Sequence, residues 1–261
     1  NCRTMEITLE KFEEVIRGLE KGEIRVAEKK GDEWIVNKWV KEVILSGFRF
    51  GTICDMSEGQ FPFFDKNTYP VRSFSAEDGV RIVPGGTSIR RGAFVAGGAI
   101  VMPPSYINVG AYVDEGTMVD SHVTIGSCAQ IGKHIHISAA TQIGGVLEPA
   151  GAMPTIIEDG AFVGGNCGIY EGTIVQEGAV IASGVIITSS TAIFDATTGE
   201  FVPRNADGRV VVPRGAVVVS GSRPVRHGVS AGSGVSLYCP VIVKYRDEKT
   251  SGSVTLEDML R

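Results

Sequence analysis

The sequence predicts a mainly β fold, a parallel β-helix built from six-residue repeats, and two observations support it. From residue 83 the chain divides into blocks of six that each begin with Val or Ile. Eleven blocks run to residue 148, and six more follow from residue 157 after an eight-residue break. In the first run the fifth place is nearly always small, and the fourth place is often Gly. Repetition of this kind indicates stacked coils.

The six-residue period has a physical cause. One block forms a short strand and a corner, so three blocks close a triangular coil of about 18 residues, and coils stack at about 4.8 Å. The aliphatic residue points into the prism, and the small fifth residue lies near a corner that excludes large side chains. Gly at the fourth place, as at Gly116 and Gly184, suits a corner with positive φ. A sandwich of alternating strands would not need this in-register period.

Residues 1–80 are expected to form a small α+β domain. An amphipathic helix is predicted within 4–20, capped by Thr8, then a hairpin turning at residues 30–32 and a second helix from Asn37. Residues 51–80 are expected to be irregular. Because repeat arrays need covered ends, this domain is expected to cap the open end of the prism, to share in the site, or both. The first helix places four apolar residues on one face: Leu9, Phe12, Ile16 and Leu19.

The β-helix is predicted over residues 81–222, with an inserted, turn-rich loop at about 194–211. The repeat is expected to return at Val212 and Val218. Residues 223–261 are read as a C-terminal extension. It contains a flexible connection, a strand over 237–246 and a short helix that begins near Thr255.

Composition limits the function classes. No apolar run is long enough for a transmembrane helix, and the N-terminus lacks the layout of a secretory signal. Five widely spaced cysteines without a CxxC pattern predict reduced thiols, and hence a cytoplasmic protein. The net charge of -5 argues against nucleic-acid binding. We therefore expect neither a nucleic-acid nor a membrane partner.

Several segments resemble one family over nearly the whole chain. Residues 107–138 read INVGAYVDEGTMVDSHVTIGSCAQIGKHIHIS, and IGGVLEP (143–149), PTIIED (154–159), VVVSGS (217–222) and SLYCPVIVK (236–244) follow. These segments are similar to the tetrahydrodipicolinate N-succinyltransferase family. The repeat alone indicates only a hexapeptide protein, whereas DEGTMVD and GSCAQIGK are specific to this family. The resemblance also implies that the β-helix is left-handed.

The resemblance implies a homotrimeric enzyme of diaminopimelate and lysine biosynthesis. It would transfer succinyl from succinyl-CoA to the amino group of ring-opened tetrahydrodipicolinate, giving N-succinyl-2-amino-6-oxopimelate and CoA, with no metal or bound cofactor. Arg81 would bind a substrate carboxylate through its planar guanidinium. Asp120, which ends DEGTMVD, would bind the amine and accept its proton as the catalytic carboxylate.

One position departs from the family pattern. The resemblance implies a Glu, present in many relatives, where this chain has Gly168. Glu171 is the candidate replacement for a second catalytic carboxylate. The CoA-binding residues implied by the resemblance are Ser183, Gly184, Ser220, Gly221 and Arg223. Late basic residues could steer the phosphates or be ordinary surface charge: Arg204, Arg209, Arg214, Arg223, Arg226 and Lys244.

Other readings remain open on the sequence. The same acceptor could be acetylated from acetyl-CoA, or the chain could be another hexapeptide acyltransferase or a purely structural prism. A zinc carbonic anhydrase would need stacked histidines, but His122 and His134 are separated by two repeats instead of three and so fall on different faces. Cys128 and Cys167 lie at places that favour small residues, so packing is expected for both.

Overall fold

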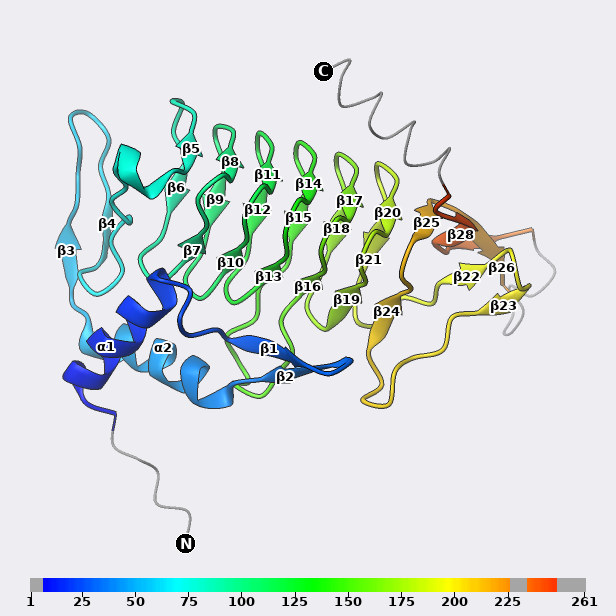
Figure 1. The fold of residues 1–261 in the computed structure, drawn as a ribbon, viewed down its shortest axis with the longest axis horizontal. Helices are drawn as coiled ribbons and strands as arrows, with labels where there is room; N and C mark the ends of the chain where they lie inside the picture. The colour runs from blue at the N-terminus through cyan, green and yellow to red at the C-terminus, as the bar shows by residue number, and fades with distance from the viewer. Residues whose placement is uncertain (1–6, 226–233, 248–261) are drawn as a thin grey trace, which may run out of the picture.

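The computed structural model describes residues 7–225 and 234–247, and it shows a long triangular β-helix with two helices along one side (Figure 1). The β-helix is left-handed, and its strands are parallel within three sheets, which confirms the predicted fold class. Strand partners in regular coils are separated by three repeats, as where Met118 lies opposite His136 and Tyr112 opposite Gln130.

A coil passes in turn through three sheets, which we number 1 to 3. Sheet 1 contains β5 (Arg81–Ile82), β8 (Ile100–Val101), β11 (Met118–Val119), β14 (His136–Ile137), β17 (Phe162–Val163), β20 (Val180–Ile181) and β25 (Ala216–Val219). Sheet 2 contains β6 (Ser88–Ile89), β9 (Tyr106–Ile107), β12 (Thr124–Ile125), β15 (Gln142–Ile143), β18 (Gly168–Ile169) and β21 (Ile186–Ile187). Sheet 3 contains β7 (Phe94–Val95), β10 (Tyr112–Val113), β13 (Gln130–Ile131), β16 (Ile156–Ile157), β19 (Thr173–Val175) and β24 (Val210–Val212).

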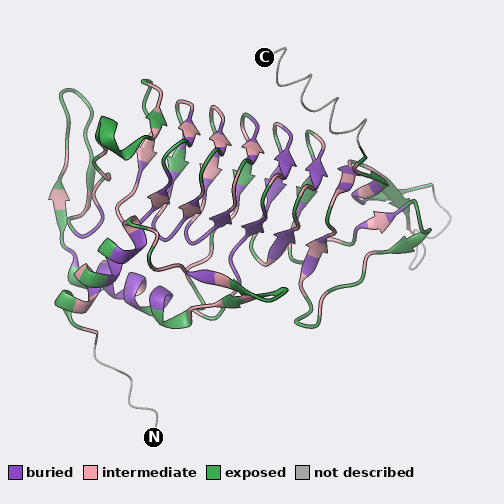
Figure 2. Cartoon of the chain, in the orientation of Figure 1, coloured by how far each residue is buried: buried purple, intermediate pink, exposed green. Residues whose placement is uncertain are grey.

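Most of these strands contain two residues, the first directed outward and the second inward. In β11 the outward Met118 is half-buried, whereas the inward Val119 is fully buried. The inward Val and Ile residues of successive coils stack into one continuous core, drawn in purple in Figure 2. Complete burial of such a side chain stabilises the fold by about 1.5–3 kcal/mol. The Val and Ile residues that recur every six positions in the sequence therefore form the core of the prism.

The first coil differs from the predicted frame by one residue. Ile82, not Val83, is the inward residue, because Ile82 lies opposite Val101. A regular coil would place Ile82 opposite Ile100, so the first coil contains one extra residue. The turn that accommodates it includes Gly85 and Gly86, whose φ values of 144° and 93° are unfavourable for other residues.

Two insertions leave the prism without changing its register. Gln130 lies opposite Ile156, where a regular coil would place Glu148, so the eight-residue break forms a loop. Val175 lies opposite Val212, where a regular coil would place Ile193. The segment inserted there includes the hairpin of β22 (Phe194–Asp195) and β23 (Glu200–Phe201). The expected return of the repeat at Val212 and Val218 is confirmed.

The N-terminal part contains α1 (Leu9–Glu20), the hairpin of β1 (Ala27–Lys30) and β2 (Glu33–Val36), and α2 (Lys38–Phe50). The Thr8 hydroxyl accepts from the backbone N–H of Lys11, as predicted for a cap. Leu9, expected on the buried face, is 54 % exposed. Residues 51–80 are not irregular throughout, since β3 (Ile53–Asp55) pairs with β4 (Phe64–Lys66) and a 3-10 turn, η1, spans Ala76–Asp78.

The two helices cover a side of the prism rather than its open end (Figure 1). Helix residues form one buried cluster with Val109 and Cys128, which lie at the corner between sheets 2 and 3. A Cβ on Gly92 would lie 3.1 Å from Ile16, and one on Gly110 would lie 3.0 Å from Ile44. The prism's first end is instead packed by residues of the connecting segment: Phe74, Val80 and Ile82.

Lys41 fastens the first insertion to α2. Its side chain is fully buried, and Nζ donates to the carbonyls of Ala152 (2.9 Å) and Pro149 (3.4 Å). Burial lowers the pKa of Lys41, because the low-dielectric surroundings disfavour its charged form. The inserted loop is thus ordered by the N-terminal part of the chain.

The C-terminal part closes the other end of the prism. The strand predicted over 237–246 is two strands, β27 (Ser236–Tyr238) and β28 (Val241–Tyr245), separated by Cys239 and Pro240. β27 pairs with β26 (Ser222–Pro224), whereas β28 pairs with β25 and places Ile242 in the core. Arg226 and the helix predicted near Thr255 lie outside the described residues. Neither helix in the described part of the chain is long and apolar enough to span a bilayer.

Glu158 joins the β1–β2 hairpin to the prism. Its buried carboxylate accepts from Lys29 Nζ (2.7 Å), Trp34 Nε1 (2.8 Å) and the backbone N–H of Glu177 (3.2 Å). Burial would raise the pKa of Glu158, but the hydrogen bonds from Lys29 and Trp34 outweigh it and lower the pKa below its usual 4.5. The charged carboxylate is therefore the form that the folded state stabilises.

We predict that Glu158→Gln lowers the free energy of unfolding by about 1.5–3 kcal/mol at neutral pH, because two donors lose a charged acceptor. A group with a lowered folded-state pKa stabilises the fold above its unfolded value, and this is lost as the pH falls through the folded value. The difference from wild type should therefore shrink below pH 4.5. Urea unfolding measures both effects, and Glu177→Gln, at an exposed ion pair with Arg214, is the control. An equal loss in both variants would contradict the prediction.

Candidate active site

The three corner rows of the prism differ in chemistry. The row between sheets 2 and 3 is largely covered by the N-terminal helices over its first coils. The row between sheets 3 and 1 carries many charged side chains: Asp114, Glu115, Lys133, Glu158, Asp159, Glu177 and Arg214. The row between sheets 1 and 2 differs from both, because small uncharged residues dominate its outer surface from β14 to β25. On this third row a ligand meets few charged side chains.

We call this row the Asp120 edge. It consists of the corners that follow β11, β14, β17, β20 and β25, and its outer residues are Ser121, His122, Ala139, Ala140, Gly165, Asn166, Ser183, Gly184 and Ser220. Positive φ values recur along it, at His122, Ala140, Asn166 and Gly184. With few long side chains, an extended ligand can approach the backbone closely. Five coils spaced at about 4.8 Å make this edge roughly 19 Å long.

The structure brings most of the sequence-predicted site residues to the Asp120 edge. Ser183 and Gly184 are exposed one coil before Ser220, whose Oγ donates to the Gly184 carbonyl (3.3 Å), and Gly221 follows. Arg223 is exposed on β26, just beyond the last corner. Arg81 is exposed on β5, two strands from β11 in sheet 1, or about 10 Å along the sheet.

Glu171 does not join this group within one chain. It follows β18 of sheet 2, and so lies exposed at the corner between sheets 2 and 3. Asp120 follows β11 of sheet 1, at a different corner and two coils earlier. The two predicted carboxylates therefore cannot act on one substrate unless they come from different chains.

Asp120 is held by contacts on both carboxylate oxygens. The backbone N–H of Ser121 donates to Oδ1 (2.7 Å), and Oδ2 lies 3.6 Å from His136 Nε2. Its own backbone N–H donates to Ile137 in the next coil (3.0 Å). The side chain is 28 % exposed, so the carboxylate is partly shielded from water yet remains accessible at the edge.

Ser138 adds a polar group beside Asp120. It occupies the same corner place one coil on, since Val119 lies opposite Ile137. The residue is buried, and its Oγ has no hydrogen-bond partner among the described residues. A buried hydroxyl in this state is costly unless a ligand or another group satisfies it.

Gly168, where the resemblance implies Glu, lies beneath an aromatic ring. A Cβ at this position would lie 2.7 Å from Tyr170 Cε2 and 2.9 Å from Ile186 Cδ1. The Tyr170 ring thus occupies the space into which a longer side chain at 168 would extend. Local packing therefore favours Gly at this position.

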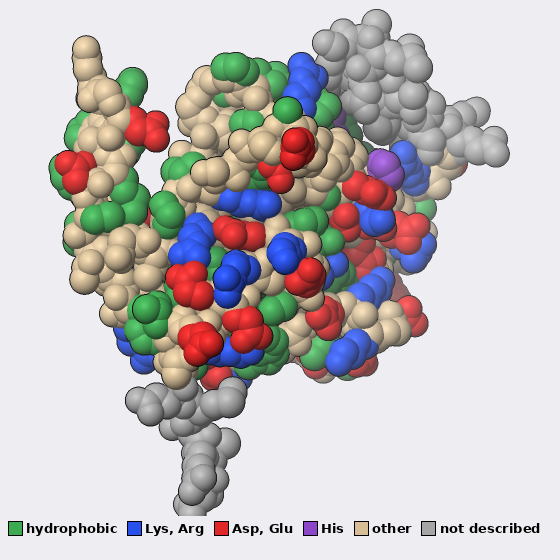
Figure 3. Space-filling view, turned by 60° about the vertical axis from the view of Figure 1, so that its left-hand side comes forward, with side chains coloured by type: hydrophobic (Ala, Val, Ile, Leu, Met, Phe, Trp, Pro, Cys, Tyr) green, Lys and Arg blue, Asp and Glu red, His purple; other side chains and the backbone are tan. Residues whose placement is uncertain are grey.

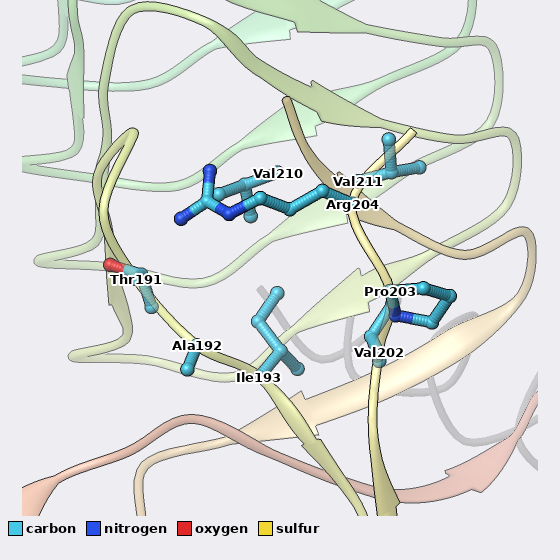
Figure 4. A pocket seen from close by; sticks show the side chains of 8 residues that line it. All are labelled: Thr191, Ala192, Ile193, Val202, Pro203, Arg204, Val210 and Val211. Atoms are coloured by element: carbon cyan, nitrogen blue, oxygen red, sulfur yellow. The ribbon is translucent and has the colours of Figure 1, made fainter. Parts of the chain in front are cut away.

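The late basic residues do not form one positive surface. Arg204 donates to the carbonyls of Ser189 (2.7 Å) and Gly208 (2.9 Å), Arg214 pairs with Glu177, and Arg209 lies beside Asp207. Arg204 also extends across a cavity of about 80 Å³ under the second insertion (Figure 4), which is too small for a coenzyme. Figure 3 shows basic and acidic side chains interspersed over another side of the molecule.

His122 and His134 lie on different faces, as predicted, and Cys128 and Cys167 are packed, as predicted. His122 lies at the Asp120 edge and His134 at the corner between sheets 3 and 1, so they are not stacked. Among the described residues, no cluster of three or more His, Cys, Asp or Glu could hold a metal. Cys167 is buried in the prism and Cys128 between prism and helices, and burial raises the pKa of the Cys128 thiol to about 12.

The residue that sequence reasoning missed is His136. It is the outward residue of β14, and its side chain reaches the carboxylate of Asp120 from the next coil. The signal was present in the repeat, because a polar residue at the outward strand place, three repeats after Met118, must lie next to the corner that holds Asp120. Reading the coils in register would have found it.

The fold is that of a hexapeptide-repeat protein, and proteins of similar sequence define it as a transferase. A model described as the hexapeptide repeat of succinyl-transferase matches residues 154–189, and one described as the N-terminal part of tetrahydrodipicolinate N-succinyltransferase matches residues 3–50.

Two curated relatives bear the name 2,3,4,5-tetrahydropyridine-2,6-dicarboxylate N-succinyltransferase. The protein of Methylococcus capsulatus is 49 % identical over 252 residues, covering 95 % of this chain and 88 % of that protein. That of Cupriavidus necator is 48 % identical, covering 95 % and 87 %. The chain belongs to the tetrahydrodipicolinate N-succinyltransferase family.

The packing at Gly168 generates a prediction. Gly168→Ala should lower the free energy of unfolding by about 1–3 kcal/mol, because the added methyl overlaps the Tyr170 ring. In a Tyr170→Ala background the same change should cost less. Chemical denaturation of the four proteins measures this coupling. Gly151→Ala, where nothing lies within 4 Å, is the control. If Gly168→Ala lowers the free energy of unfolding as much in the Tyr170→Ala background as in wild type, the Tyr170 ring does not restrict the side chain at residue 168.

Proposed function

We propose that this protein transfers a succinyl group from succinyl-CoA to the amino group of tetrahydrodipicolinate, in the diaminopimelate and lysine pathway. One water adds to the cyclic imine of tetrahydrodipicolinate and opens the ring, which frees the amino group, so the products are N-succinyl-2-amino-6-oxopimelate and CoA. The observation that carries this proposal is near 49 % identity, over 95 % of the chain, to proteins named for this activity. The position of Asp120 on the open edge of the prism supports it.

The Asp120 edge suits an extended acyl-CoA. Between Asp120 and Ser220 it offers roughly 19 Å of small residues, along which a pantetheine arm can lie against backbone groups. Ser183, Gly184, Ser220 and Gly221 would line the arm, and exposed Arg223 would attract its phosphates. Succinyl-CoA is thus a co-substrate, and the proposal needs no metal or resident cofactor.

Asp120 is the proposed acid–base group. The acceptor amine attacks the thioester carbonyl carbon, so that an N–C bond forms and the carbonyl π electrons move to oxygen. Asp120 binds the amine and receives its proton. The intermediate then expels the CoA sulfur, the C–S bond breaks, and the proton leaves with the thiol. The Ser138 hydroxyl is available to donate to the developing oxyanion, and Arg81 would bind an acceptor carboxylate.

A homotrimer would complete the site. One prism exposes the Asp120 edge as a convex corner, which cannot enclose a substrate alone. Glu171 lies at another corner and can approach Asp120 only from a second chain. Three parallel prisms would place such corners together between neighbours. We place the enzyme in the cytoplasm, in keeping with four free cysteines among the described residues.

Thiol release from succinyl-CoA tests the activity. Mixed with tetrahydrodipicolinate, the purified protein should release CoA, and mass spectrometry should show a product heavier than tetrahydrodipicolinate by one succinyl group and one water. Without the acceptor, release should be negligible. Acetyl-CoA is the comparison donor, and a faster reaction with it would replace the proposed activity by acetyl transfer.

The roles of the two carboxylates are tested by isosteric variants. Asp120→Asn should lower kcat by roughly 10²- to 10⁴-fold, because an amide cannot accept the proton. The KM for succinyl-CoA should stay near the wild-type value, and light scattering should give the mass of a trimer for both proteins. Glu171→Gln is measured in parallel. If Asp120→Asn retains its turnover while Glu171→Gln loses it, the assignment of the two carboxylates is wrong.

A further inference from the structure

We propose that His136 is a positioning residue for this reaction, which acts by orienting the carboxylate of Asp120. The inference rests on the proposed function, since it needs Asp120 as the acid–base group. Three observations support it: the contact between the two side chains, the packing that fixes the imidazole, and the place of both residues in the coil register.

The contact joins neighbouring coils. His136 Nε2 lies 3.6 Å from Asp120 Oδ2, while Oδ1 accepts from the Ser121 backbone N–H at 2.7 Å. One carboxylate oxygen is therefore hydrogen-bonded to the backbone, and the other faces the imidazole just beyond hydrogen-bond distance, so both have a neighbour that limits rotation of the carboxylate. Each oxygen keeps a lone pair for the acceptor amine.

The imidazole is itself held in place. The His136 side chain is 14 % exposed, and its ring meets the Phe162 ring edge to face, with centroids 5.3 Å apart and planes at 83°. Met118, on its other side, is the strand partner in the preceding coil. Packed between neighbours in sheet 1, the ring has little freedom to turn away from Asp120.

The register makes this arrangement a consequence of the fold. Residue 136 is the outward place of β14, directly opposite Met118 of β11, and Asp120 begins the corner that follows β11. An outward side chain here has Asp120 as its nearest charged neighbour along the Asp120 edge. Any change that kept the coils in register would keep the two residues together.

Orientation matters to the reaction because proton transfer needs the carboxylate within hydrogen-bond reach of the amine. A carboxylate free to rotate would spend part of its time turned away from the attacking nitrogen. Small misplacements of a catalytic group lower turnover strongly. His136 transfers no proton in this proposal, and it is not in contact with the reacting atoms.

The test compares two substitutions at position 136. His136→Leu should lower kcat by roughly 10- to 100-fold, with the KM for both substrates within about twofold of wild type, because orientation rather than binding is lost. His136→Gln keeps an N–H donor near the place of Nε2, and should retain kcat within about fivefold. His134→Asn changes an exposed histidine at another corner and is the control, with unchanged kinetics expected.

Combination with Asp120→Asn separates this role from a structural one. If His136 acts through Asp120, His136→Leu should have no further effect on the residual kcat of Asp120→Asn. Full kcat in His136→Leu, or an undiminished loss in the double variant, would overturn the inference. If His136→Leu does not assemble, His136→Gln decides, and a loss beyond tenfold there would overturn it. An active Asp120→Asn enzyme would instead refute the proposed role of Asp120.

Discussion

Hydrogen bonding between successive coils, at a fixed interval of three repeats, is the constraint on which this structure depends. Each coil donates to the next, as from Asp120 to Ile137 (3.0 Å) and from Ala182 to Val218 (2.8 Å). Because two-residue strands offer few hydrogen bonds each, the stack is stable only when every inward place holds a side chain that packs on its neighbours. The strict Val and Ile frame meets that requirement.

The same constraint explains how the chain tolerates its insertions. Extra residues are accommodated at corners, where they leave the prism, and the ladder resumes in register beyond them. The first insertion is ordered by Lys41, and the second contributes Ile193 to the terminal core. The β-helix can therefore carry inserted loops and hairpins at its corners without any change to the register of its core strands.

The three corner rows share one backbone geometry but differ in their side chains, so each row has a different role in the structure. One row carries the N-terminal helices, one meets solvent with charged residues, and the Asp120 edge keeps small residues and a single carboxylate contacted by His136. Because adjacent corners along an edge are about 4.8 Å apart, groups from different coils can act on one extended ligand. The proposed chemistry follows from this linear array.

The repeat was sufficient to predict the coils, their sheets and the inward residues, because each depends only on a local six-residue pattern. Asp120, Ser183 and Ser220 could be placed at corners for the same reason. The pattern could not show that the helices pack against a side of the prism, that residues 51–80 contain a hairpin, or that the first coil has one extra residue. Counted in threes, the repeat does separate Glu171 from Asp120 and puts residue 136 beside the corner of Asp120, but it could not place the His136 imidazole against Oδ2. These features depend on side-chain packing and on contacts between segments far apart in the chain, and only the assembled coils determine them.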